Sequence, residues 1–359
     1  MNALPPVFFL ALLALPVLAP LAVARAEEPA AAVPPETAER EDLPAVAEPP
    51  SAEALEPLAA QGDAKARRQL AWRLFQGVGA EKDEARAVAL LAAAAEQGDA
   101  TSLRNLGFLR LEGCAALERD PAEGERLLRR AAEAGDWQAC IRAAENCRDP
   151  ALGVPDFDAA RNWFRKAAER IETMAPDERD AFALFALGQL RFFGEGVAPD
   201  RERGLALVER AAELGEPQAQ SFLGEVYRLG KGRQRDLARA FEWHLKAAQA
   251  GFAQSQYLVA ANYWHGDGVA PDPEESYAWA LKAAEQGHAQ AAYNVARCLL
   301  DGSGTAPDHD AGMEWMRKAA DLGSNDAENF LVPVPVWTSS PRPLPDLGIE
   351  LRQSIPLLH

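Results

Sequence analysis

The stretch EPQAQSFLGEVYRLGKGRQRDLARAFEWHLKAAQAG, which runs from Glu216 to Gly251, decides the fold. Apolar residues recur at helical spacing through its first half, which closes with a Gly-x-Gly loop that begins at Gly230. A second helical pattern follows Asp236 and closes at Gly251. Aspartate is a favoured N-cap residue, and glycine readily adopts the left-handed turn that ends a helix. The stretch therefore predicts two helices joined by a short loop.

The same unit recurs along the chain with a fixed period. The first glycines of four such loops are Gly194, Gly230, Gly266 and Gly302, which lie 36 residues apart, and two further loops, one of them degenerate, precede them. A period of this length indicates stacked helix-turn-helix units. The seven copies are Asp63 to Gly98, Asp99 to Gly135, Asp136 to about Arg179, Asp180 to Gly215, Glu216 to Gly251, Phe252 to Gly287, and His288 to Gly323.

The third copy departs from this pattern. Pro150 occupies the place of its first loop glycine, and the insertion IETMAPDER, from Ile171 to Arg179, lies at the end of its second helix. We expect a longer second helix or a protruding turn there, with a local change in the curvature of the array.

The repeated unit resembles the Sel-like repeat (SLR) family, whose members are related to the tetratricopeptide repeats. The shared pattern is A-x-x-x-L-G-x-x-Y-x-x-G-x-G-x-x-x-x-D-x-x-x-A-x-x-W-x-x-K-A-A-x-x-G, and it covers roughly Asp63 to Gly323. The resemblance implies an all-α fold, a right-handed α/α superhelical solenoid of seven helix-turn-helix repeats with the first helices on its inner face. It also implies an adaptor that holds other proteins in complexes, not a catalyst.

The N-terminal segment differs from the repeats. Residues 1–26 combine a short apolar run with Ala24-Arg25-Ala26, which fits a signal peptidase site, so we expect a cleaved export signal. Residues 27–57 hold seven prolines, eight alanines and nine acids against one arginine, a composition that predicts a disordered linker. At the end of this segment, residues 51–61 are expected to form an incomplete helix that covers the first repeat.

The C-terminal segment also differs from the repeats. The predicted solenoid covers residues 58–331, and a tail follows at 332–359 with six prolines in its 28 residues. Proline interrupts helices, so most of this tail is not expected to be helical. We expect it to cover the apolar end of the solenoid, as terminal units must. A motif that another protein binds is the alternative.

The charge of the chain limits the classes of partner that it is expected to bind. The net charge is -17 at pH 7. Nucleic acids and anionic lipids attract basic surfaces, so an acidic chain fits neither of them. We expect no membrane-spanning segment after signal cleavage. The expected partners are proteins of the cell envelope, and the chain is expected to be a periplasmic or secreted monomer.

No motif indicates catalysis or cofactor binding. The five histidines show no metal-ligand spacing, and the Gly-x-Gly loops follow helices and lack the lysine and Ser/Thr of a phosphate-binding loop. Trp163, Trp243, Trp279 and Trp315 share one repeat position that holds leucine in other copies, which indicates a core position. We therefore expect no cofactor, no metal and no enzymatic activity.

The remaining candidate site is a surface on the first helices. On each first helix, a row of positions lies outside the stripe of apolar residues that faces the core. The resemblance places this row on the inner groove. Aromatic residues and arginine are the types that anchor protein interfaces. Packing between adjacent first helices is the alternative for Phe192 and Trp264. The candidate binding residues are Trp72, Phe75, Asn105, Phe108, Arg142, Glu145, Gln189, Phe192, Glu225, Arg228, Trp264, Asn294 and Arg297.

An exported chain meets an oxidising compartment, so its cysteines are candidates for disulfides. The four cysteines, Cys114, Cys140, Cys147 and Cys298, allow three connectivities, and the sequence does not choose between them. Cys140 and Cys147 lie about 10 Å apart along one predicted helix, too far for a disulfide. Cys114 and Cys147 lie in adjacent copies and form the possible disulfide. Cys298 aligns with a core position and is expected to be a small buried hydrophobe.

The sequence thus favours an exported scaffold that binds a protein partner on the concave face of the array. The alternative is a cell-wall protein or enzyme that acts on peptidoglycan or its fragments. A tight cluster of acid, base and arginine in the groove would favour that alternative. Only Arg142, Glu145 and Arg148 are close enough in register to form one.

Overall fold

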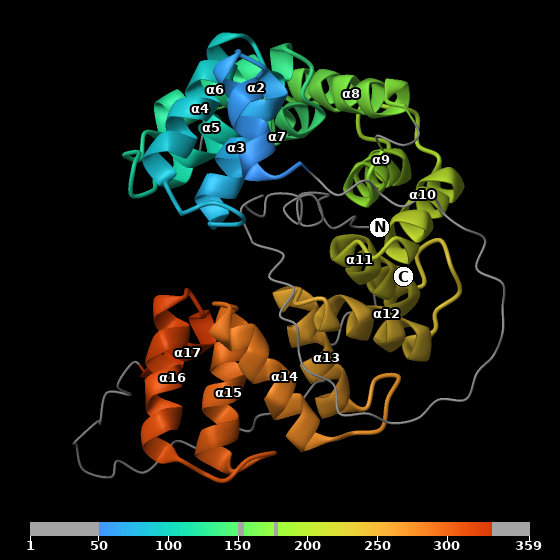
Figure 1. Cartoon of the computed structure of the whole chain (residues 1–359). Helices are drawn as coiled ribbons and strands as arrows, with labels where there is room; N and C mark the ends of the chain where they lie inside the picture. Colours follow the sequence, from blue (N-terminus) through green and yellow to red (C-terminus); the bar gives the residue numbers. More distant parts are fainter. Residues whose placement is uncertain (1–49, 150–153, 176–178, 332–359) are drawn as a thin grey trace, which may run out of the picture. The chain divides into compact units, whose positions relative to one another are not determined.

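The computed structural model describes residues 50–149, 154–175 and 179–331 (Figure 1). Within these residues the regular structure is all helical, with sixteen helices and no β-strand. None of these described helices is long and apolar enough to span a bilayer. The predicted signal at 1–26, the predicted linker up to residue 49 and the predicted tail at 332–359 lie outside the described residues.

The helices follow one another as pairs, one pair for each predicted copy. The first helices are α3 (Ala64–Gln76), α5 (Ala100–Glu112), α7 (Trp137–Arg148), α9 (Ala181–Phe193), α11 (Pro217–Leu229), α13 (Ala253–His265) and α15 (Ala289–Asp301). The second helices are α4 (Glu84–Glu96), α6 (Pro121–Glu133), α8 (Phe157–Thr173), α10 (Arg201–Glu213), α12 (Leu237–Gln249), α14 (Pro273–Glu285) and α16 (His309–Asp321). The shorter helices α2 (Ala52–Ala60) and α17 (Asn325–Leu331) stand at the two ends. The prediction of an all-α array of seven helix-turn-helix repeats is confirmed.

The helices pack as two compact units. One unit holds α2 to α8 with the loop 194–198, and the other holds α9 to α17. Within each unit the two helices of a copy pack on each other, and the second helix of a copy packs on the first helix of the next copy. Each unit is therefore a stack of helix pairs, which is the arrangement of a solenoid.

Helix α2 confirms the expected helix over residues 51–61. It begins after Ser51, whose hydroxyl accepts the N–H of Ala54 at 3.2 Å. The helix packs on α3 and buries Leu55 and Ala59. The predicted boundary between linker and solenoid at residue 57 falls inside α2, so the folded array starts at Ser51.

The second helix of the third copy is longer than its counterparts, as expected. α8 has 17 residues, whereas the second helices of the other six copies have 13. Its last turn buries Ile171 completely. The first residues of the insertion are therefore part of a packed helix.

Aspartate side chains begin the second helices at the predicted places. Each accepts a backbone N–H from the first turn, which satisfies one of the unpaired donors at a helix start. These N-caps are Asp83, Asp120, Asp156, Asp200, Asp236, Asp272 and Asp308.

The second glycine of a Gly-x-Gly loop packs against the preceding copy. Gly268 and Gly304 have φ angles of +79° and +74°, a region in which other residues are strained. A Cβ at Gly268 would overlap the carbonyl oxygen of Leu237, and a Cβ at Gly304 would overlap that of Pro273. Leu237 and Pro273 begin the second helices of the preceding copies. The loop therefore determines the packing between copies as well as the end of a helix.

The two helices of the fifth copy pack closely at Gly224. A Cβ at Gly224 would overlap the imidazole ring of His244 on α12. His244 is fully buried, and this burial lowers its pKa to about 4. The imidazole is therefore a neutral part of the core.

The tryptophan row packs against the core without being fully buried in it, so the prediction of a core position is confirmed only in part. Each ring is half-buried. The ammonium of the lysine three residues later in the sequence lies over it, at 3.9 to 4.1 Å from the ring centroid. The pairs are Trp163 with Lys166, Trp243 with Lys246, Trp279 with Lys282, and Trp315 with Lys318. A cation–π contact explains why the two residues recur at this spacing. The buried position is the next one along the helix, as at Phe164 and Met316.

Candidate protein-binding face

The predicted binding residues of the first two copies lie around one cleft. Trp72 and Phe75 on α3 line it from one side, and Asn105 and Phe108 on α5 line it from the other. Its volume is about 310 Å³. Because α3 and α5 are the first helices of neighbouring copies, Trp72 and Phe108, which occupy the same repeat position, line opposite sides of the cleft.

Three aromatic side chains contribute accessible surface to this cleft. The side chain of Trp72 is 53% exposed, and Phe75 and Phe108 are half-buried. A large indole that remains exposed in a folded chain is unusual, and tryptophan is among the residues that most often anchor protein interfaces. The cleft is therefore suited to receive apolar side chains of another molecule.

Two arginines at one repeat position border the cleft. Arg68 donates to both carboxylate oxygens of Asp99, at 2.9 and 2.8 Å, and Arg104 donates to both of those of Asp136, at 3.3 and 3.0 Å. Asp99 and Asp136 are the N-caps of α5 and α7. Each arginine thus joins its copy to the start of the next copy, and its charge is already compensated.

Asn105 is one of the polar residues that line the cleft. Its side-chain oxygen accepts from Arg104, with distances of 3.4 Å to Nε and 3.2 Å to a terminal nitrogen. Its amide nitrogen has no hydrogen-bond partner in the part of the chain that the structure describes. This orientation leaves an N–H₂ group available to a carbonyl of a bound segment.

The charged residues of the third copy do not form a catalytic cluster. Arg142 lies 3.9 Å from Glu125, and Arg148 donates to Glu195 at 3.0 Å. Glu145 lies between the two arginines in sequence but forms an ion pair with neither among the described residues. Burial raises the pKa of Glu145 to about 7, although both arginines act to lower it. The two arginines are bound to other acids, so this triad resembles packed ion pairs more than a reactive site.

Two predicted binding residues of the fourth copy are buried, and their assignment to the surface is wrong. Gln189 is fully buried, and Phe192 is only 8% exposed. Phe192 packs edge-to-face against Phe193 and Phe222, with ring centroids 5.0 and 5.5 Å away. Since Phe222 comes from the next copy, aromatic packing between α9 and α11 covers this part of the row. The alternative that Phe192 packs between first helices is therefore the right one.

In the fifth, sixth and seventh copies, part of the predicted row of binding residues is exposed again. Trp264 is 44% exposed, and Asn294 is half-buried. Arg228 is exposed and donates to Glu225 through two hydrogen bonds of 2.9 and 2.7 Å. The exposed Arg297 lies 3.8 Å from Asp301, within its own helix.

The predicted disulfide is absent, and all four cysteines are free thiols. Cys114 packs against the apolar cluster of the first copy, which contains Leu74 and Leu91. Cys147 instead lines a pocket between α6 and α8. The two thiols therefore belong to different surroundings, although their copies are adjacent. Cys298 is buried, as expected.

The sequence interpretation missed two features. The paired arginines Arg68 and Arg104 stand 36 residues apart at one repeat position, and this spacing was the signal that pointed to them. The pocket between α6 and α8 has no repeat signal, because its residues come from one irregular copy and its neighbour. Within the described residues, no group of three His, Cys, Asp or Glu side chains is placed to hold a metal ion.

Comparison with known proteins finds a matching family model and similar solved structures. The Sel1 repeat model matches residues 64–99, 100–136, 137–170, 181–216, 217–252, 253–288 and 289–324. The structure of a Sel1 repeat protein from Oxalobacter formigenes is 27% identical, with 78% of each chain covered and a TM-score of 0.51. A protective antigen of uropathogenic Escherichia coli with an SLR fold is 30% identical, with 79% of this chain and 59% of that chain covered and a TM-score of 0.48. No curated protein matches the sequence.

Proposed function

Because this chain belongs to the Sel1 repeat family, we propose that it is a scaffold that binds a protein partner on the exposed face of its first helices. We place this activity outside the cytoplasm, in the cell envelope. Proteins built from Sel1 repeats generally serve as platforms for protein–protein interaction. The proposal assigns binding, and not catalysis, to this chain.

The cleft between α3 and α5 is the observation that carries the proposal. Trp72, Phe75 and Phe108 present aromatic surface to solvent there, while the neighbouring Arg68 and Arg104 are fixed by their ion pairs. Rigid aromatic anchors next to fixed polar groups lose little conformational entropy when a partner binds. A partner segment with an apolar side chain in the cleft and a backbone carbonyl near Asn105 meets both features.

The alternative of a cell-wall enzyme receives less support. Its candidate cluster consists of Arg142, Glu145 and Arg148, and the arginines of this cluster are already paired with Glu125 and Glu195. A general acid needs a route to its substrate as well as a raised pKa. The ionised side chains here stabilise one another, which supports a structural role.

Affinity capture of the exported chain tests the proposal. We expect a protein that is retained by the parent to be lost when Trp72, Phe75 and Phe108 are changed together to alanine, with helicity unchanged. Each true anchor contributes about 2 kcal/mol or more to binding. The matched control is Phe157→Ala, which removes an aromatic side chain that is 62% exposed at the start of α8. Loss of capture in the control and not in the triple variant would place the binding face elsewhere.

A reporter fusion tests the compartment. Residues 1–26, joined to a reporter that is active only outside the cytoplasm, should export it, and the mature chain should begin at Glu27. A chain that retains Met1 after cell fractionation would contradict the proposed location.

A further inference from the structure

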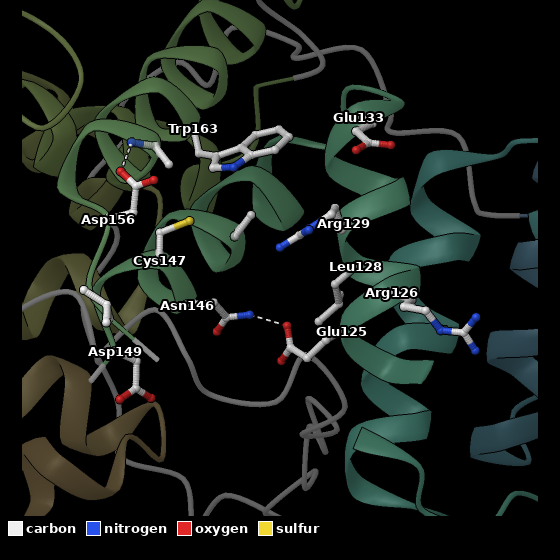
Figure 2. A pocket seen from close by; sticks show the side chains of 13 residues that line it. Glu125, Arg126, Leu128, Arg129, Glu133, Asn146, Cys147, Asp149, Asp156 and Trp163 are labelled. Atoms are coloured by element: carbon white, nitrogen blue, oxygen red, sulfur yellow. Dashed lines mark hydrogen bonds between the residues drawn. The ribbon is translucent and has the colours of Figure 1, made fainter. Parts of the chain in front are cut away.

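The first helix of the seventh copy, α15, begins with a histidine cap. Nδ1 of His288 accepts the backbone N–H of Ala291 at 3.2 Å. Most other caps in this chain are carboxylates, and Figure 2 includes one at the start of α8, where Asp156 accepts the N–H of Ala159 at 2.9 Å. The first helices of the first four copies are capped by Asp63, Asp99, Asp136 and Asp180. Among the first helices that the structure describes, α15 alone has an imidazole in this role.

Contacts with the sixth copy hold the imidazole of His288 in one orientation. Its Nε2 lies 3.1 Å from Oε1 of Gln254 on α13. Its ring stacks on that of Tyr257 on the same helix, with the ring centroids 4.6 Å apart and an angle of 18° between the ring planes. The side chain therefore starts α15 and also joins the seventh copy to the sixth.

The two hydrogen bonds of His288 determine which ring nitrogen carries the hydrogen. A backbone N–H only donates, so the Nδ1 that faces Ala291 must be the acceptor. Nε2 then carries the hydrogen and donates it to the side-chain oxygen of Gln254. The imidazole is therefore neutral in this arrangement.

A proton on Nδ1 of His288 is incompatible with the cap. Nδ1 would then be a donor that faces another donor, and the N–H of Ala291 would lose its acceptor. The hydrogen bond from Nε2 to Gln254 is the same in both charge states. A tyrosine ring also attracts cations, so the stack on Tyr257 accepts either state. The difference between the two states therefore lies at the start of α15.

Few charged groups lie close to this imidazole. Tyr257 faces it from α13, and Asp326 of α17 acts on the hydroxyl of Tyr257. Glu285, at the end of α14, is exposed. Burial lowers the pKa of His288 from 6.5, a backbone contact opposes this, and no charged side chain of the described residues contributes to the shift. The unfolded chain therefore binds the proton more tightly, so the stability that the cap contributes is complete above pH 6.5 and is lost as the pH falls below this value.

We propose that His288 is a pH-sensitive cap, which holds the start of α15 when it is neutral and releases it when it is protonated. The first turn of α15 also carries Gln290, which donates to Asp326 of α17 at 3.1 Å. Release of this turn therefore affects the contact with the last helix that the structure describes. Copies near the end of a solenoid have fewer neighbours to hold them in place. This property of the seventh copy does not depend on the proposed binding of a partner.

The ring nitrogens of His288 test the proposal directly. In the full chain labelled with nitrogen-15 histidine, two-bond correlation spectra at about pH 7.5 should show the form with hydrogen on Nε2. The signal is assigned by its loss in His288→Asp. Its titration midpoint should lie below 6.5. Hydrogen on Nδ1, or a midpoint at or above 6.5, would overturn the proposal.

Hydrogen exchange of the α15 amides tests the consequence. Between about pH 7.5 and about pH 5, protection of the first turn, corrected for the intrinsic effect of pH, should fall about five- to tenfold. His288→Asp introduces the cap of the first four copies, which accepts throughout this range, so its protection should stay level. The matched control His309→Gln changes an exposed histidine at the start of α16 and should keep the decline. A level profile in the parent, or the same decline in His288→Asp, would show that His288 is not the switch.

Discussion

Arg104 on α5 donates to Asp136 at 3.0 Å, and Asp136 in turn accepts the N–H of Ala139 at 2.8 Å and so caps α7. One carboxylate therefore both starts a helix and joins two copies. Both side chains are buried, at 9% and 7% exposure. The equivalent pair of the first copy, Arg68 with Asp99, has the same geometry but is more open to solvent.

Loss of Arg104 should destabilise the start of the third copy. Arg104→Met leaves the buried carboxylate of Asp136 without its counter-ion, which costs about 3 kcal/mol. Arg68→Met is the matched control, and it should cost less than about 1 kcal/mol because water screens the more exposed pair. Hydrogen exchange of the α7 and α5 amides in the full chain measures both effects. Equal losses of protection in the two variants would show that burial does not distinguish the pairs.

Acid should loosen the fifth copy before its neighbours. Burial lowers the pKa of His244 from 6.5 to about 4, while Glu225 acts to raise it and Arg228 to lower it. The unfolded chain therefore binds the proton more tightly, so the stability contributed by neutral His244 is complete above pH 6.5 and is lost as the pH falls toward 4. The loss is about 3 kcal/mol over this range. Amide exchange of α11 and α12 at several pH values should follow this curve.

The variant His244→Leu isolates the cause of this pH dependence. Leucine occupies the equivalent buried position at Leu91 and Leu128, so it is compatible with the packing of a second helix. Protection of α11 and α12 in this variant should be flat between pH 4 and 6.5. A slope that persists without the imidazole would assign the effect to the Glu225–Arg228 pair.

The third copy should show the opposite pH dependence. Burial raises the pKa of Glu145 from 4.5 to about 7, so the folded chain holds the proton more tightly than the unfolded chain. The stability that Glu145 contributes to the third copy is therefore greatest below pH 4.5 and falls as the pH rises through 7. Glu145→Gln should remove this decline and leave α7 more protected than in the parent at pH 8. Glu133→Gln, which changes an exposed glutamate of α6, is the control and should leave the decline intact.

The elements predicted well from the sequence are those that local chemistry determines. Gly268 and Gly304 need positive φ angles, and Asp236 and Asp272 need only the backbone of their own helix as a partner. Repetition of these residues fixes the period and hence the fold. Such signals do not depend on which other copy packs nearby.

The parts that were predicted wrongly depend on neighbouring copies. Phe192 shares a repeat position with the accessible Phe75, yet Phe222 of the next copy covers it. Trp279 packs against the core, as its exchange with leucine in other copies predicts, but its ring remains partly exposed and Lys282 lies over it. A repeat position specifies the helix face, while its exposure depends on the side chains of adjacent copies.

The glycines that contact a preceding helix should be less replaceable than the glycines that only end a helix. Gly251 has φ of +91°, and a Cβ added there would meet nothing within 4 Å, so Gly251→Ala should cost about 1 kcal/mol for the left-handed backbone alone. Gly304→Ala adds an overlap with the carbonyl of Pro273, so the loop must move away from α14. We expect a loss of several times the control value, measured by urea unfolding, with amide protection reduced on α14 and α15 together. If the two variants lose the same stability, the loop does not join the copies, and the 36-residue period reflects helix termination alone.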